Sequence, residues 1–306
     1  MKQKAQFTLL LTDAGMGDMV GYLVAVNYLI KTFNHIQFNI WVPDYLYQFA
    51  QHVLPPGSEV FKFSGKAKLD PNVPGLSTAW NGIHTPMRTH PVDYAFHVLA
   101  DRHEYNLENK NYLQITPTLI NTKRFKLPEN YACIVTTAAE PCKALPPEVL
   151  NGIADHVIQK GLTPVFLGKE IVNTGFNDLA ITATTISVDY SKGINLVNKT
   201  SMLEAAKIMG ESQIVIGMDS GLIHLAGCTD TRIIAGYSLV DPIHIAPIRK
   251  ASQSYKFLAV EPDLDIENRY YQTNNNFKAE DYRSFPYKEV IQNLTLDKWL
   301  KAIDYT

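Results

Sequence analysis

The chain has few cysteines, almost no net charge and no long apolar run, and each absence excludes a class of protein. Its 3 cysteines among 306 residues stand far apart without a CxxC or Cys/His pattern, which argues against a disulfide framework or a zinc site. A formal net charge of -2 gives no overall attraction to nucleic acid, although a local basic patch stays open. The N-terminal apolar run stops at Asp13, too early for a signal peptide or membrane span. We therefore expect a cytoplasmic protein, with a peripheral position at the inner membrane left open.

Several catalytic signatures are also missing. The chain contains no GxGxxG, GxxxxGKS, GxSxG or HExxH, so dehydrogenase, P-loop, hydrolase and zincin functions lack their sequence motifs. The DxD spacing of Asp263 and Asp265 occurs in metal-dependent transferases, but these have a different, single-domain architecture. Two exposed carboxylates are more often a solvated turn. We therefore expect neither a metal nor a cofactor.

The sequence does contain a regular alternation of strand and helix patterns. With 46% hydrophobic and 19% charged residues it has the balance of a globular protein. Short apolar, β-branched runs at 5–12, 131–137 and 213–217 predict buried strands, each followed by a helix pattern. This βαβ rhythm predicts parallel sheets with helices on their faces.

The alternation forms two successive series, which predict two domains. We expect the first domain over 1–127 and the second over 128–290. An amphipathic helix pattern over 291–306 would pack back on the first domain. A ligand cleft is expected between the domains, at the carboxyl ends of the strands.

The stretch DSG stands where the apolar run QIVIG turns into a helix pattern. Such a junction presents unpaired backbone N–H groups and the positive end of a helix, which suit a phosphate. A simple helix cap made by Asp219 and Ser220 is the alternative.

Four motifs, in order along the chain, resemble those of the ADP-heptose:LPS heptosyltransferases, glycosyltransferase family 9. They are AGMGDMVGYLVAVNYL, TTAAEPCKALPPEV, FLGKE and GMDSGLIHLAGCTDTRIIAGYSLVDP. The resemblance covers most of residues 128–248 and one turn of the N-terminal half. It implies an α/β fold of the GT-B type, two Rossmann-like domains with parallel sheets facing across a cleft. It also implies inverting, metal-independent transfer from a nucleotide-diphosphate sugar to an acceptor hydroxyl.

The resemblance assigns roles to two charged residues. Inverting transfer needs a base for the acceptor proton, and Asp18 is the candidate, standing behind Gly15 and Gly17, which we expect to let the backbone turn. A helix-capping role for Asp18 and a catalytic role for Asp13 stay open. Lys143 matches the family lysine that contacts the donor phosphates.

The other donor-side candidates come from the same motifs. Ser220 and Gly221 would donate backbone N–H groups to the diphosphate, Gly221 also letting the ligand approach closely. Asp219 would accept hydrogen bonds from sugar hydroxyls. The remaining candidates, each with an ordinary structural alternative, are Thr136, Thr137, Glu170 and His224.

Departures from the family pattern leave the sugar and the acceptor open. Ser220 stands where the family commonly has Thr, and Ala144 and Leu145 replace an aromatic–proline pair after the lysine. An acceptor glycan is expected, with a protein hydroxyl or a modified nucleobase in DNA as alternatives. A catalytically silent nucleotide-sugar-binding protein of a glycan assembly system and an epimerase are the competing functions. The GMGD motif favours the transferase, because a binder needs no base.

Overall fold

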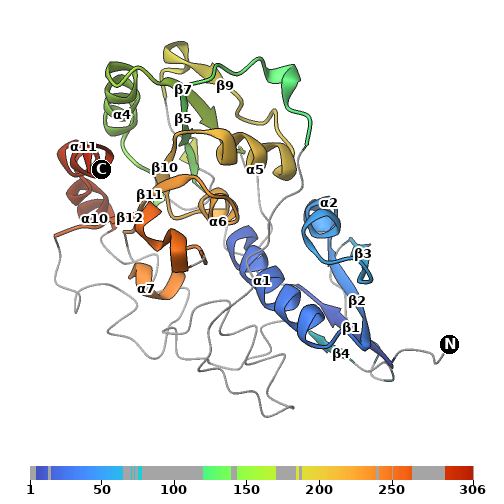
Figure 1. Ribbon diagram of the computed structural model, residues 1–306. Helices are drawn as coiled ribbons and strands as arrows, with labels where there is room; N and C mark the ends of the chain where they lie inside the picture. The colour runs from blue at the N-terminus through green and yellow to red at the C-terminus, as the bar shows by residue number, and fades with distance from the viewer. Residues whose placement is uncertain are drawn as a thin grey trace.

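The computed structural model describes residues 5–12, 15–64, 70, 72, 75–77, 120–138, 143–169, 184–185, 188–238, 241–249, 251–263 and 287–305. It contains two larger parallel sheets, one in the blue N-terminal part of the chain and one in the part from green to red (Figure 1). The predicted βαβ series are therefore confirmed as two α/β units.

The first sheet has four parallel strands in the order β3-β2-β1-β4. In its second strand Phe38, Ile40 and Val42 are buried, whereas Trp41 between them is 36% exposed, so alternate side chains face the helices. The elements are β1 (Ala5–Leu10), α1 (Met16–Thr32), β2 (Ile36–Pro43), α2 (Asp44–Val53), β3 (Glu59–Phe63) and β4 (Gly75–Ser77).

The second sheet has six parallel strands in the order β12-β11-β10-β5-β7-β9, covered on both faces. One core cluster joins it to α5 and α6, and the other joins it to α4 and α11. Its strands are β5 (Tyr131–Val135), β7 (Thr163–Leu167), β9 (Ile194–Asn195), β10 (Ile214–Met218), β11 (Arg232–Gly236) and β12 (Phe257–Val260). Its helices are α4 (Pro147–Gln159), α5 (Met202–Glu211), α6 (Gly221–Gly227), α7 (Pro242–Ile245), α10 (Tyr287–Asn293) and α11 (Leu296–Asp304). A two-stranded ladder pairs β6 (Thr137–Ala138) with β8 (Thr184–Thr185).

Local sequence signals fix several helix ends. The capping box that opens α5 is present: the Ser201 hydroxyl accepts from the Glu204 N–H at 3.3 Å, and the Glu204 carboxylate accepts from the Ser201 N–H at 2.9 Å. Pro147 is the first residue of α4, and Gly161, with φ +78°, follows its end.

The segment that precedes the second sheet contains Arg124, which binds it to helix α5 of the second unit. Arg124 donates to both carboxylate oxygens of Glu204 in α5, at 2.9 and 3.0 Å, in a bidentate pair. It also donates to the carbonyl oxygen of Lys199 at 3.1 Å. The exact domain boundary near residue 127 stays a prediction.

The C-terminal segment differs from the expectation. Leu294 and Thr295 separate α10 from α11, so the pattern gives two helices instead of one. α11 packs against α4 and β12 of the second unit, where Trp299 is completely buried. The prediction that this segment packs back on the first domain is therefore wrong for α11, because its apolar face is already used in the second core. Gly152 of α4 makes room: a Cβ there would lie 2.5 Å from Leu296 Cδ2.

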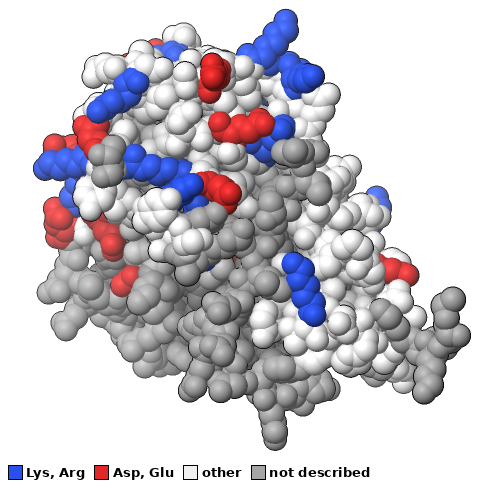
Figure 2. Space-filling model, viewed as in Figure 1, with Lys and Arg blue, Asp and Glu red and all other residues white. Residues whose placement is uncertain are grey.

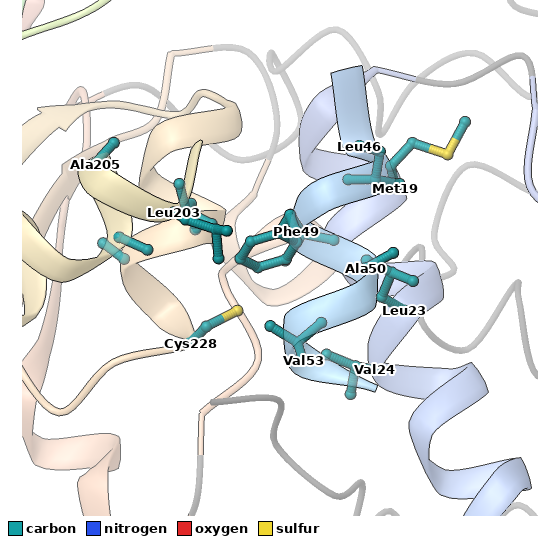
Figure 3. Close-up of a cluster of buried hydrophobic side chains, with 14 of the residues drawn as sticks. Met19, Leu23, Val24, Leu46, Phe49, Ala50, Val53, Leu203, Ala205 and Cys228 are labelled. Carbon is teal, nitrogen blue, oxygen red and sulfur yellow. The ribbon is translucent and has the colours of Figure 1, made fainter. Parts of the chain in front are cut away.

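The two units pack against each other through helices whose apolar side chains form one buried cluster. α1 packs against α6 and α2 against α5. Phe49 projects from α2 toward Leu203 of α5 (Figure 3), and both residues belong to the same buried apolar cluster as Met19 and Leu23 of α1. Burying an aromatic side chain of this size stabilises the folded state by roughly 1.5–3 kcal/mol. The contact therefore joins the two units through their helices.

Charges on the visible face are mixed. Lysine and arginine side chains alternate with aspartate and glutamate over the second unit (Figure 2). Among the helices that the structure describes, none has the length and apolar character needed to cross a bilayer. Electrostatic attraction of a charged ligand therefore has to come from a local cluster of charges.

Candidate active site

The GMGD and DSG turns meet where α1 packs against α6. Each follows the carboxyl end of a strand, α1 after β1 and α6 after β10. The contact is so close that a Cβ on Gly17 would lie 2.6 Å from His224 Cδ2, and one on Gly221 would lie 2.3 Å from Met16 Cε. The two motifs, from different units, therefore build one site.

The glycines of the first turn serve packing. Gly15 has φ -66° and ψ 163°, a conformation open to any residue, and Gly17 lies inside α1. Positive φ values among the described glycines belong to Gly57 and Gly161. The prediction that Gly15 and Gly17 let the backbone turn is therefore wrong. Gly17 is needed because any side chain there would collide with His224.

Asp219 contacts two basic side chains of the second unit. Lys143 Nζ is 2.8 Å from one carboxylate oxygen, and His224 Nε2 is 3.3 Å from the other. The side chain of Asp219 is only 7% exposed. Burial opposes its charge, but Lys143 and His224 outweigh burial and hold the pKa of Asp219 well below its usual range. Asp219 is therefore a permanent anion at neutral pH.

Asp18 faces this group from the first unit. It is the third residue of α1, half-buried, and its carboxylate accepts from the Gly15 N–H at 3.1 Å. Burial raises the pKa of Asp18, and Asp219 adds to the rise. His224, Lys143 and the Gly15 hydrogen bond act in the opposite direction. Asp18 therefore makes the helix-end hydrogen bond. Its pKa is nevertheless raised overall, so the carboxylate binds a proton more tightly than an ordinary aspartate does.

A tyrosine that interacts electrostatically with Asp18 could not be recognised as a site residue from the sequence. Tyr45, in the first turn of α2, has a side chain that is 48% exposed. Partial burial raises the pKa of Tyr45 to about 12, and the negative charge of Asp18 adds to this effect. A tyrosine in a chain with 16 of them has no distinctive spacing, so only the fold could find it.

Thr136 and Thr137 do not join the cluster. Thr136 is completely buried, and its hydroxyl donates to the Leu167 carbonyl oxygen at 3.4 Å. The Thr137 hydroxyl accepts from the Lys169 N–H at 3.0 Å. Both hydroxyls therefore stabilise the strand ends, which is the structural alternative for a threonine in this position.

Three further candidates have different outcomes. Ser220 is the N-cap residue of α6, but its hydroxyl makes no capping bond and is buried without a partner among the described residues. The simple side-chain cap is therefore absent. Glu170 and Asp13 lie outside the described residues, so their roles stay predictions.

The described part of the chain holds no group of three or more His, Cys, Asp or Glu side chains arranged to bind a metal. Asp263 of the DxD sequence pairs with Lys298 at 2.8 Å, and Asp265 lies outside the described residues. Burial raises the pKa of Cys133 and Cys228 to about 12, so both thiols stay protonated.

Comparison with protein families gives one match. A family described as "Glycosyltransferase family 9 (heptosyltransferase)" matches residues 77–272, more than half of the chain. No curated protein sequence matches the chain.

Solved structures share the whole fold at low identity. A glycosyl transferase family 9 protein from Veillonella parvula DSM 2008 is 14% identical, with 99% of this chain and 98% of that chain covered and a TM-score of 0.71. The iron-containing dodecameric glycosyltransferase TibC from enterotoxigenic E. coli H10407 is 11% identical, with 99% and 77% covered and a TM-score of 0.71. E. coli heptosyltransferase WaaC, solved with ADP, is 15% identical, with 93% and 99% covered and a TM-score of 0.55. The expected GT-B fold of two Rossmann-like domains is confirmed.

Proposed function

Because the chain belongs to glycosyltransferase family 9, and is therefore a glycosyltransferase, we propose that it moves a sugar from a nucleotide-diphosphate donor to an acceptor hydroxyl with inversion and without a metal. One observation carries the proposal. Where α1 packs against α6, Asp18 stands at the start of one helix, and just before the other Asp219 pairs with Lys143 at 2.8 Å and His224 at 3.3 Å. In keeping with these surroundings, the pKa of Asp18 is raised and that of Asp219 is lowered. Two carboxylates that differ in this way are suited to different tasks.

Lys143 is the cation that would receive the donor diphosphate. Its ammonium pairs with Asp219 at 2.8 Å, and its side chain is 28% exposed, so an entering anion can reach it. The unpartnered Ser220 hydroxyl and the Gly221 N–H lie at the adjacent start of α6 and would complete the contact. TibC was solved with ADP-D-beta-D-heptose and WaaC with ADP, which supports an ADP-linked donor as the first to test.

Asp18 is the general base in this proposal. The acceptor oxygen attacks the anomeric carbon and loses its proton to Asp18, while the bond between that carbon and the diphosphate oxygen breaks. The bonding electrons leave with the diphosphate, whose added negative charge Lys143 stabilises. A single displacement of this kind inverts the anomeric configuration. Tyr45, beside Asp18, would border the acceptor.

The ammonium of Lys143 supplies the positive charge that a divalent metal provides in other transferases. Metal independence has its own test, since the related TibC is iron-containing. Dialysis against a chelator should leave the transfer rate unchanged. A loss of activity that returns with added iron would refute this part of the proposal.

The first experiment measures thermal stability against ADP, UDP, GDP, CMP and dTDP and their sugar conjugates. A ligand at one hundred times its Kd raises the free energy of unfolding by about 2.7 kcal/mol. Lys143→Ala should abolish the shift and Asp18→Asn should retain it. Lys298→Ala is the matched control, since Lys298 also pairs with an aspartate at 2.8 Å but at a different site.

Transfer is then followed by NMR of the anomeric proton in the product, with saccharide acceptors first. An inverted product supports the mechanism, and a retained configuration refutes it. Donor binding without transfer to any acceptor class, including protein and DNA hydroxyls, would favour the silent nucleotide-sugar-binding protein. No shift with any nucleotide would exclude both functions.

A further inference from the structure

Tyr237 places a buried hydroxyl next to the donor side of the site. The residue directly follows β11, its side chain is 1% exposed, and its ring packs edge-on against Phe257 with the ring centroids 6.2 Å apart. Its hydroxyl has no hydrogen-bond partner among the residues that the structure describes. A buried hydroxyl without a partner is unfavourable for the folded state. A partner in another state of the protein would explain why the hydroxyl is there.

The register of the sheet sets Tyr237 beside Asp219. Met218 in β10 pairs with Gly236 in β11, and the Asp219 N–H donates to the Gly236 carbonyl oxygen at 2.9 Å. The ladder therefore continues to the next residue on each strand. Side chains at matching positions of neighbouring parallel strands lie on the same face, about 5 Å apart. Burial raises the pKa of Tyr237 well above its usual value. Asp219 and, to a smaller extent, Glu261 add to the rise and Lys143 opposes it, so the hydroxyl remains a hydrogen-bond donor.

Donor binding would change the partners that are available to the Asp219 carboxylate. Without a ligand, Lys143 and His224 occupy its two carboxylate oxygens. When Lys143 turns to the diphosphate, this buried carboxylate loses its lysine partner. A buried charge that loses its partner is strongly destabilising unless another donor replaces it.

We propose that Tyr237 is a positioning residue, whose hydroxyl donates a hydrogen bond to Asp219 when the donor diphosphate draws Lys143 away. This inference rests on the proposed function, because it needs Lys143 to bind the diphosphate. Tyr237 keeps Asp219 ionised and oriented in the donor-bound state, and it is unengaged in the ligand-free protein. Its contribution is therefore specific to one state.

The first test measures donor affinity and thermal stability of Tyr237→Phe. Removing the hydroxyl should weaken binding of the nucleotide sugar roughly tenfold, the effect of losing one hydrogen bond to a charged group. It should leave the ligand-free Tm unchanged or slightly higher, because an unpaired hydroxyl is removed. An affinity within twofold of wild type would overturn the proposal.

Tyr131→Phe is the matched control. The Tyr131 hydroxyl is also buried, but it donates to the Ile208 carbonyl oxygen at 2.7 Å and lies at the other end of the second sheet. This variant should lower Tm and leave donor affinity unchanged. The two tyrosines are thus expected to show opposite effects, which a general packing defect cannot produce.

A double-mutant cycle tests the proposal without any nucleotide. In Lys143→Ala, Asp219 has lost its lysine, so Tyr237 becomes its donor, and Tyr237→Phe should now lower Tm although it does not do so in wild type. Additive effects would overturn the inference. Lys143→Met, which keeps the length of the side chain, replaces alanine if that variant does not fold. Because the cycle needs no ligand, its failure is distinguishable from failure of the wild-type protein to bind nucleotides, which would refute the proposed function.

Discussion

Asp18 and Asp219 stand near the starts of two helices that pack against each other, one from each domain, and their surroundings differ. Asp219 is in direct contact with Lys143 and His224, at 2.8 and 3.3 Å. Asp18 accepts a backbone hydrogen bond from Gly15 at 3.1 Å and interacts with Lys143 and His224 electrostatically. The comparison teaches that the same two basic side chains outweigh burial at Asp219, with which both pair directly, but do not outweigh it at Asp18.

The largest effect is expected from Asp18→Asn, which removes the proposed proton acceptor and keeps the shape of the side chain. Loss of a general base typically lowers kcat by about 10²–10⁴-fold. Donor affinity should not change, because the proposed donor contacts lie in the other domain. The measurement is release of the nucleoside diphosphate in the presence of acceptor.

Asp44→Asn is the control for Asp18. Asp44 also lies in the first turn of its helix, and its ion pair with Lys62 at 3.9 Å is exposed. The activity of the Asp44→Asn variant should equal that of wild type. If Asp18→Asn retained more than a third of the wild-type rate, Asp18 would not be the base.

Asp219→Asn tests the other side of the comparison. It leaves the Lys143 ammonium beside a neutral amide, and breaking a buried pair by removing one partner costs about 3 kcal/mol. Urea denaturation should show this loss of the free energy of unfolding without a change in slope. Asp304→Asn, which removes a surface carboxylate that pairs with Lys160 and His156, should cost clearly less. Equal losses in the two variants would contradict the special position of Asp219.

Much of the fold could be predicted from the sequence because the signals are local. The buried run over 131–135 and the Ser201–Glu204 capping box identify their elements without any knowledge of the partner elements. The C-terminal segment shows where such signals stop. The amphipathic pattern around Trp299 predicts a buried face, but it does not specify which part of the protein covers that face.

The site was predictable in its residue types and not in its contacts. Lys143 and Asp219 follow different strands, so their direct pairing depends on the sheet order. Thr136 and Thr137 also stand at a strand end, yet backbone groups occupy their hydroxyls. Sequence places a residue at the correct edge of the sheet, and the neighbouring strands decide which groups it meets.

Gly17→Ala probes the packing that brings the two carboxylates together. The added Cβ would lie 2.6 Å from the His224 ring, so the ring and helix must shift. Overpacking of this kind costs about 1–3 kcal/mol, partly offset by the better helix propensity of alanine, so a net loss of about 1–2 kcal/mol is expected. Thermal denaturation measures it. Gly15→Ala, whose Cβ would meet Asp18 at 3.3 Å and no other described residue within 4 Å, should cost less, and the reverse order would contradict the packing role of Gly17.

The pH dependence sharpens the comparison without a mutation. Because the pKa of Asp18 is raised above 3.8, the carboxylate takes up a proton, and kcat/KM should fall, at a pH where an ordinary aspartate is still ionised. The pKa of Asp219 is lowered, so its contribution to stability is complete above pH 3.8 and is lost only as the pH falls toward its own pKa.

Acidification should therefore remove activity before it removes the stabilising contribution of Asp219. Protonation of Asp18 does not itself destabilise the protein, since a raised pKa makes the protonated form the more stable one in the fold. Parallel profiles of kcat/KM, donor affinity and urea midpoint against pH measure the separation. In Asp18→Asn the residual rate should lack this acid limb. If activity and stability were lost together at the same pH in the wild-type protein, the two carboxylates would not have the separate roles that their surroundings indicate.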